Sequence, residues 1–208
     1  AEVIVEKTCA NSLRVPFVNK IFPEAKYIFI CRDGFDVVAS AKKRWTAKID
    51  IPYLYQKVKY IPKLDLPYYA LTYFFSRLFR FFSNEKRLAF WGPKLKNMNT
   101  LLKKYDLTEI CALQWKACVE KAEKSLKKMP KDKVLHVRYE SFVCHPFEEI
   151  TRILDFIGKP QKKKVIVNSI KNVSNKSLGK GRKNLSKEQI KKVEILIQET
   201  LKNYDYLP

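Results

Sequence analysis

Hydrophobic positions form short strand-like runs that alternate with helical stripes along most of the chain. Strands are predicted at residues 3–5, 27–31 and 133–138. Residues 27–31 are almost continuously apolar, which is typical of a strand covered on both faces. Helical spacing of apolar residues predicts helices over residues 14–22, 35–45 and 108–129. This alternation favours an α/β fold in three layers, with a mainly parallel sheet.

The C-terminal third continues with helices. Pro146 opens a segment with a helical apolar stripe, and Gly158 is expected to end it. Residues 161–184 are basic and rich in Ser, Asn and Gly, so we expect a loop there. Ser186 and Gln189 have the spacing of a capping box, which predicts the start of a last helix.

Residues 49–95 have a different character, because they are rich in Tyr, Phe, Lys, Leu and Pro. We interpret them as a helical and aromatic lid inserted into a single domain that spans residues 1–208. Two interpretations of the aromatic side chains stay open. They pack over the core, or they make a peripheral contact with a membrane surface.

Composition and charge narrow the class of protein. The 208 residues are 46% hydrophobic, as in folded proteins. The sequence holds no apolar stretch of about 18 residues, the length that a membrane-spanning helix needs. Lys and Arg number 42 against 21 Asp and Glu, a net charge of +21. This excess favours an anionic partner, whether nucleic acid, anionic membrane or a phosphorylated or sulfated small molecule. A soluble basic surface explains most individual lysines equally well.

The sequence holds few residues that could bind a metal. Five cysteines lack a zinc-type spacing, and there are only two histidines. We therefore expect no metal, and we interpret the cysteines as thiols in a reducing compartment. The expected location is the cytoplasm, or alternatively the Golgi lumen if an N-terminal anchor precedes this sequence.

One constellation of basic and hydroxyl residues suggests an anion site. Arg32 follows the predicted strand 27–31, and the next helix carries Ser40 and Arg44 on one face. Tyr139 follows the strand 133–138. Parallel sheets bind ligands beyond the carboxyl ends of their strands, so Arg32 and Tyr139 are expected at the functional edge. An ion pair between Arg32 and Asp33 at a turn is the alternative for this arginine.

Ordered motifs over nearly the whole chain resemble a known family. They are residues 6–8 (Glu-Lys-Thr), 13–16 (Leu-Arg-Val-Pro), 22–26 (Phe-Pro-Glu-Ala-Lys), 31–34 (Cys-Arg-Asp-Gly), Ser40, 137–142 (Val-Arg-Tyr-Glu-Ser-Phe) and 177–182 (Ser-Leu-Gly-Lys-Gly-Arg). Together they resemble the sulfotransferases that use 3′-phosphoadenosine 5′-phosphosulfate (PAPS), closest in spacing to the protein-tyrosine and bacterial branch. The resemblance implies a P-loop-like fold and transfer of a sulfuryl group from PAPS to a hydroxyl or amine acceptor.

The resemblance also implies roles for individual residues. Arg32 and Ser40 match the pair that binds the 3′-phosphate of the nucleotide, and Arg44 matches a further basic contact. Tyr139 matches a residue that lines the nucleotide site. Lys180 matches a lysine that binds the donor, although Gly181 stands where the family commonly has tryptophan.

The resemblance assigns Lys7 a catalytic role, stabilising charge on the bridging oxygen near the sulfuryl group. In the family, the loop that holds the 5′-phosphosulfate precedes the Glu-Lys-Thr motif, and no glycine of this sequence lies in such a loop. We therefore interpret the chain as the C-terminal part of a sulfotransferase that lacks this loop and lacks turnover by itself. The alternative function, from another class, is a non-catalytic basic module that binds nucleic acid or an anionic membrane.

Overall fold

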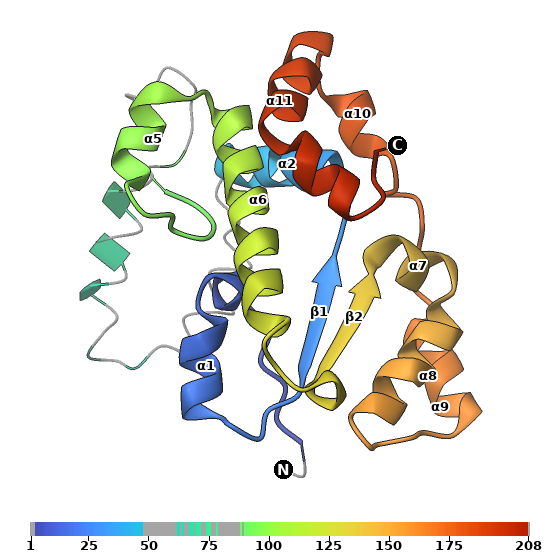
Figure 1. Ribbon diagram of the computed structural model, residues 1–208. Coiled ribbons are helices and arrows are strands. Elements are labelled where there is room, and N and C mark those ends of the chain that lie inside the picture. Colours follow the sequence, from blue (N-terminus) through green and yellow to red (C-terminus); the bar gives the residue numbers. More distant parts are fainter. Residues whose placement is uncertain are drawn as a thin grey trace. The chain divides into compact units, whose positions relative to one another are not determined.

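A two-stranded parallel sheet lies at the centre of the described chain (Figure 1). Strand β1 is Tyr27–Cys31 and strand β2 is Val134–Arg138. Tyr27 pairs with Val134, and Cys31 pairs with Arg138. Because the strands are parallel and in step, both end at the same edge. Arg32 and Tyr139 therefore emerge next to each other.

The computed structural model describes residues 3–47 and 90–207, together with residues 62, 64, 67, 68, 70, 71, 74, 75, 78 and 88. The chain divides into two compact units. The first unit contains Ala1–Ala39 and Pro93–Pro208, and the second contains Ser40–Gly92. The sheet and the site described below belong to the first unit.

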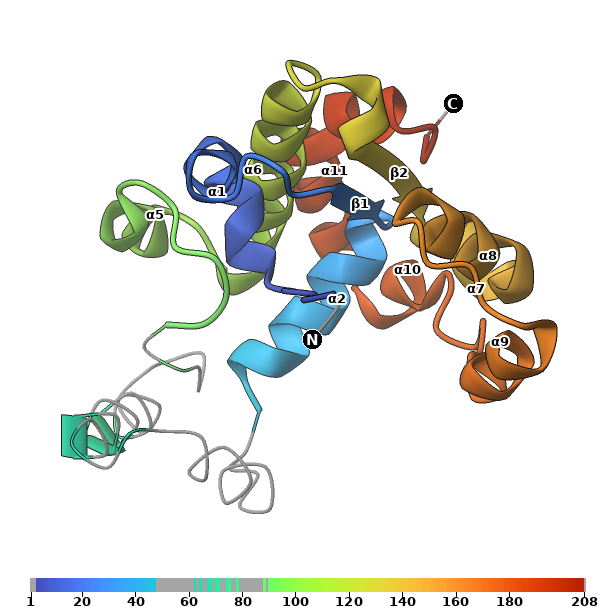
Figure 2. The ribbon, with the colours of Figure 1, turned by 90° about the horizontal axis from the view of Figure 1, so that it is seen from below.

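The helices on the β1 side of the sheet pack around one long helix (Figures 1 and 2). The long helix is α6 (Leu107–Leu126), and the helices around it are η1 (Cys9–Leu13), α1 (Val15–Ile21) and α5 (Met98–Lys104). Helix α6 contacts η1, α1 and α11 (Lys187–Asn203), and it begins at a capping box formed by Asp106 and Glu109. Its apolar side chains, including Ile110 and Trp115, are buried in the core.

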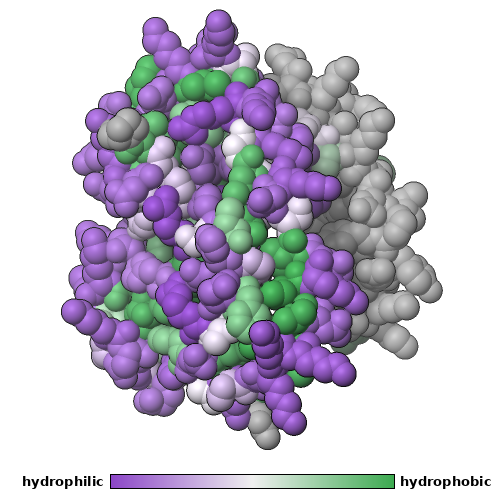
Figure 3. Space-filling model, turned by 90° about the vertical axis from the view of Figure 1, so that its right-hand side faces the viewer, coloured by the Kyte–Doolittle hydropathy of each residue, from purple (hydrophilic) through white to green (hydrophobic). Residues whose placement is uncertain are grey.

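The β2 side carries α7 (Tyr139–Cys144), α8 (Pro146–Phe156) and α9 (Lys163–Ile170) (Figures 1 and 2). Pro146 stands in the first turn of α8, and Gly158 adopts a φ of 73° just after this helix ends. That backbone conformation favours glycine. Figure 3 shows this side of the molecule, where hydrophilic side chains cover most of the described surface and hydrophobic ones lie in separate patches.

Three helices lie near the carboxyl edge of the sheet: the first turns of α2 (Gly34–Trp45), the short α10 (Lys180–Asn184) and α11 (Figure 1). Helix α11 begins at Ser186, whose hydroxyl accepts from the Gln189 backbone while the Gln189 side chain accepts from the Ser186 backbone. Gly34 opens α2 against α11, and a Cβ there would lie 2.7 Å from Ile197 Cδ1. The helix can pass this closely only because Gly34 has no side chain.

The second unit contains the later turns of α2. Trp45 is fully buried and stacks edge to face with Phe90, at 5.9 Å between ring centroids. The Leu88 amide donates to the Trp45 carbonyl at 2.9 Å. The predicted lid, residues 49–95, lies mostly outside the described residues.

Most predicted elements are confirmed, including the α/β class, the parallel sheet and the capping box at Ser186. The strand predicted at residues 3–5 is wrong, because a strand needs a backbone partner and this segment pairs with none of the described residues; its apolar side chains are exposed. The loop predicted at 161–184 is also wrong in part, since α9 and α10 lie within it. The expectation that β1 is covered on both faces fails at Ile30, which is exposed.

Candidate functional site

The aligned strand ends bring Arg32 and Tyr139 into contact. The Arg32 Cζ atom lies 4.4 Å from the centroid of the Tyr139 ring. A guanidinium over an aromatic face is attracted by the ring's quadrupole, and the planar ring also limits where the guanidinium can turn. The predicted placement of these two residues at one edge of the sheet is therefore correct.

Arg32 is only partly paired within the protein. Its Nη2 donates to Asp36 Oδ2 at 3.1 Å and to the Ser177 carbonyl at 3.0 Å. Its Nε is buried and has no hydrogen-bond partner among the described residues. Buried donors are nearly always satisfied in folded proteins, so this unpaired guanidinium nitrogen is unusual and marks Arg32 as the centre of the candidate site.

The segment Ser177 to Arg182, which we call the 177–182 loop, folds back onto this arginine. The Ser177 hydroxyl lies 3.3 Å from the Tyr139 hydroxyl. The amides of Gly179 and Gly181 both donate to the carboxylate of Asp36, at 3.1 Å and 2.6 Å. These bonds place the loop next to the Arg32–Tyr139 pair.

Gly181 is required by this close packing. A Cβ at Gly181 would lie 2.3 to 2.4 Å from backbone atoms of Phe35 and Asp36. No side chain fits at that distance, so the tryptophan common in the resembling family could not occupy this position without moving the loop. At Gly181, where the sequence departs from the family pattern, the packing leaves no room for a side chain.

Arg182 and Asp33 close the other end of the loop. The Arg182 Nη1 lies 3.2 Å from Asp33 Oδ2, and its Cζ lies 3.9 Å from the centroid of the Phe35 ring. Asp33 also accepts from the amides of Phe35 and Asp36 at the start of α2. The alternative of an Arg32–Asp33 ion pair is therefore wrong, because Asp33 pairs with Arg182 and Arg32 pairs with Asp36.

Side chains from other elements fix the backbone around Arg32. The indole of Trp115, on α6, donates to the Arg32 carbonyl at 3.1 Å. Glu140, on α7, accepts from the Asp33 amide at 3.0 Å and from the Tyr206 hydroxyl at 2.9 Å. Burial, and then the nearby Cys31 and Glu140, raise the pKa of Tyr206, so this hydroxyl stays protonated as a donor.

The other predicted site residues are exposed. Lys180 opens α10 within the 177–182 loop, and Lys7 lies in the extended segment before η1. Ser40 and Arg44 lie on the later turns of α2, in the second unit. The structure thus joins Arg32 and Tyr139 to the loop that carries Lys180, while the roles of all these residues stay predictions.

Sequence reasoning missed Asp36, and it assigned no role to Ser177 although this residue begins the 177–182 motif. The spacing of four residues between Arg32 and Asp36 is a weak signal for their ion pair. Nothing in the spacing indicates that Asp36 binds backbone amides 143 and 145 residues further along the chain. Only the folded structure reveals this contact.

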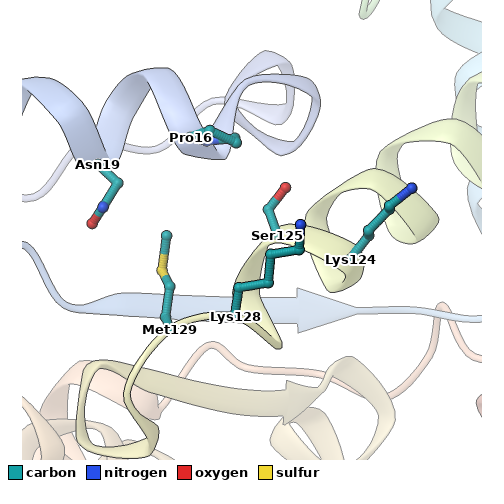
Figure 4. A pocket seen from close by; sticks show the side chains of 6 residues that line it. All are labelled: Pro16, Asn19, Lys124, Ser125, Lys128 and Met129. Carbon is teal, nitrogen blue, oxygen red and sulfur yellow. The ribbon is translucent and has the colours of Figure 1, made fainter.

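The cavity in Figure 4 is separate from the Arg32 site. It measures about 310 Å³ and lies between Pro16 and Asn19 of α1 and the C-terminal end of α6, where Ser125 and Lys128 face it. No residue of the Arg32 site lines it. We therefore base the candidate site on the unpaired Arg32 nitrogen and its neighbours.

The described residues offer neither a metal site nor a membrane-spanning helix. Within the described part of the chain, no group of three or more His, Cys, Asp or Glu side chains could hold a metal ion. Among residues 3–47 and 90–207 and the few described positions between them, no helix is long and apolar enough to cross a membrane.

Comparisons with known proteins agree with the fold. No curated protein matches the chain. The fold is similar to the crystal structure of sulfotransferase STF9 from Mycobacterium avium, with a TM-score of 0.52 and 13% sequence identity. The match covers 94% of this chain and 40% of that one, so the chain spans less than half the length of STF9. The sequence matches the sulfotransferase domain family over residues 12–204, a range that excludes Lys7, and the chain therefore belongs to the sulfotransferase family.

Proposed function

We propose that the Arg32 site holds the nucleotide of PAPS and that the protein transfers a sulfuryl group from PAPS to a hydroxyl or amine acceptor. The observation that carries this proposal is the Arg32 Nε, which lacks a partner among the described residues. Because this atom is buried, a phosphate would reach it only after neighbouring side chains move. A phosphate oxygen is the acceptor that a guanidinium recognises best.

The neighbouring groups fit such a nucleotide. The Tyr139 ring offers an apolar and aromatic wall next to the guanidinium. Lys180, in the 177–182 loop, supplies a further positive charge at the same edge. The family resemblance also assigns Ser40 and Arg44 to the 3′-phosphate, as a hydroxyl and a second guanidinium, and these roles stay predictions.

PAPS and the protein make different contributions to the proposed reaction. PAPS supplies an activated sulfuryl group, and the protein's share is positioning and charge stabilisation. Arg32, Tyr139 and the 177–182 loop would orient the nucleotide end. Lys7 would stabilise negative charge near the sulfuryl group.

The test is calorimetric titration with adenosine 3′,5′-bisphosphate, with adenosine 5′-monophosphate as the matched ligand that lacks the 3′-phosphate. Arg32→Ala should weaken binding of the bisphosphate by roughly 2–4 kcal/mol, because a charge-assisted partner of a phosphate is lost. Arg32→Lys should recover only part of this loss, since an ammonium lacks the Nε donor and the planar fork.

Arg152→Ala is the control, since this arginine pairs with Glu149 on α8. Equal affinities of the wild type and Arg32→Ala for the bisphosphate would overturn the proposal. Tighter binding of an unrelated oligonucleotide than of the bisphosphate would favour a basic nucleic-acid-binding module instead.

A further inference from the structure

Asp36 occupies an unusual position for a charged residue. Its side chain is only 3% exposed, although it lies next to the candidate site. It accepts three hydrogen bonds, from Arg32 Nη2, from the Gly179 amide and from the Gly181 amide. Two of these donors come from a loop more than 140 residues away in sequence.

A carboxylate suits this position because it only accepts hydrogen bonds. A buried carboxylate is costly unless charge and hydrogen bonds compensate it, and here one guanidinium and two amides do so. Both oxygens are used, with Oδ1 bound by Gly181 and Oδ2 shared by Gly179 and Arg32. An amide in its place would turn one of these acceptors into a donor facing an N–H group.

The arrangement has a consequence for Arg32. Asp36 and the Ser177 carbonyl both bind Nη2, which turns that nitrogen toward the protein. The Nε atom is left without a partner among the described residues. The same carboxylate therefore holds the loop and fixes the orientation of the guanidinium.

We propose that Asp36 is a positioning residue: it binds the 177–182 loop to the start of α2 and so holds Arg32 and Lys180 in place for the same nucleotide. This inference rests on the proposed function for the identity of the nucleotide. The loop-holding role rests on the contacts of Asp36 alone.

The first experiment uses no nucleotide. Hydrogen exchange of the Gly179 and Gly181 amides is compared in the wild type, in Asp36→Asn and in Gly181→Ala, with buried α6 amides as a measure of global stability. Both variants should speed exchange in the loop about tenfold or more while α6 amides change less, because the loop loses its acceptor or its fit. Gly181→Ala leaves the carboxylate intact, and it provides the test of the loop contact if Asp36→Asn fails to fold.

Gly158→Ala is the matched control. A Cβ at Gly158 would meet no atom within 4 Å, and this residue lies after α8. Its positive φ, which Gly181 does not share, makes the substitution strained locally but away from the loop. Its substitution should leave exchange in the loop unchanged. Wild-type exchange rates of the Gly179 and Gly181 amides in Asp36→Asn would overturn the loop-holding role.

The second experiment tests positioning for the ligand, by a double-mutant cycle with adenosine 3′,5′-bisphosphate. Lys180→Ala should weaken binding several-fold in the wild type and by less than twofold in Asp36→Asn, where the loop is no longer held. If Asp36 only stabilised the fold, Lys180→Ala would weaken binding by the same factor in both backgrounds, and that result would overturn the inference.

The two experiments separate the inference from the proposed function. If the wild type does not bind the bisphosphate but loop exchange accelerates in Asp36→Asn, the nucleotide assignment is wrong and the loop-holding role stands. If the bisphosphate binds and the loop is unaffected in both variants, the nucleotide assignment stands and the role of Asp36 is wrong.

Discussion

The guanidinium of Arg32 lies over the ring of Tyr139, at 4.4 Å from Cζ to the ring centroid. The two residues are 107 positions apart, and their contact follows from one backbone relationship. Cys31 pairs with Arg138 in the parallel sheet, so the residue after each strand end projects from the same edge. The register of two short strands thus sets the geometry of the candidate site.

Substitutions at Tyr139 should separate the aromatic ring from the hydroxyl. Tyr139→Ala removes the ring beneath Arg32 and should weaken binding of adenosine 3′,5′-bisphosphate by about 1–2 kcal/mol. Tyr139→Phe keeps the ring and loses only the 3.3 Å contact with Ser177, so it should weaken binding of the bisphosphate by only about 0.5–1 kcal/mol. Calorimetry measures both; a larger loss for Tyr139→Phe than for Tyr139→Ala would contradict the stacking role.

Gly34 should not tolerate a side chain. The Cβ of Gly34→Ala would lie 2.7 Å from Ile197 Cδ1 and 3.1 Å from the Trp115 ring, so the buried Ile197 and Trp115 side chains must shift to make room. We expect a loss of about 1–3 kcal/mol in the free energy of unfolding, measured with urea.

Ile197→Val provides the specific check on this clash. Valine lacks the Cδ1 atom, so Ile197→Val should partly rescue Gly34→Ala, although by itself it should cost about 0.5–1.5 kcal/mol. The double variant should then be more stable than the sum of the two single losses predicts. Strict additivity would show that Gly34 matters for a reason other than this contact.

Glu123 should make stability depend on pH. Burial raises the pKa of this carboxyl, but hydrogen bonds from Tyr204 and His136 outweigh burial, and the net pKa is lowered. A lowered pKa in the folded state means that the ionised form stabilises the protein above the usual glutamate pKa of about 4.3, and that this contribution fades as pH falls below it.

Glu123→Gln should therefore lower the free energy of unfolding by about 1–3 kcal/mol at pH 7. The difference from the wild type should shrink between about pH 5 and pH 3 in urea unfolding, because the wild-type carboxyl becomes protonated there. Glu148→Gln, on the exposed surface of α8, is the control and should show no such convergence. A gap that stays constant down to pH 3 would argue against the ionised role of Glu123.

Cys31 should be inert in the folded protein. It lies at the end of β1 with 5% exposure, and burial raises its pKa to about 12. Because the thiolate is the reactive form, iodoacetamide at pH 8 should label the exposed Cys9 and Cys144 well before Cys31. Peptide mass analysis of native and urea-unfolded samples measures this order, and early labelling of Cys31 in the native sample would disagree with its burial.

Local signals in the sequence were sufficient for the scaffold. The strand at residues 27–31 could be predicted from its apolar run between Pro23 and Gly34, and the last helix from the Ser186–Gln189 pair at its start. Both were predictable because each signal depends only on neighbours within one turn or strand. The same reasoning failed at residues 3–5, where strand propensity exists without a partner among the described residues. It also failed within 161–184, where polar composition concealed two short helices.

The candidate site could be predicted only in outline. Arg32 and Tyr139 were found because each directly follows a predicted strand, and parallel pairing brings strand ends together. Asp36 was not found, since its partners at Gly179 and Gly181 lie on a distant loop. No local spacing encodes which loop returns to which helix.

The distance along the chain between Asp36 and Gly181 also constrains the order of events during synthesis. Translation runs from the N-terminus, so β1 and the first turns of α2 leave the ribosome long before the segment that supplies their amide donors. Until residue 181 emerges, the carboxylate of Asp36 lacks the two donors that accompany its burial in the finished protein. Contacts this far apart in sequence are costly in entropy and form late. The Arg32 site should therefore be among the last parts of the molecule to acquire its native geometry.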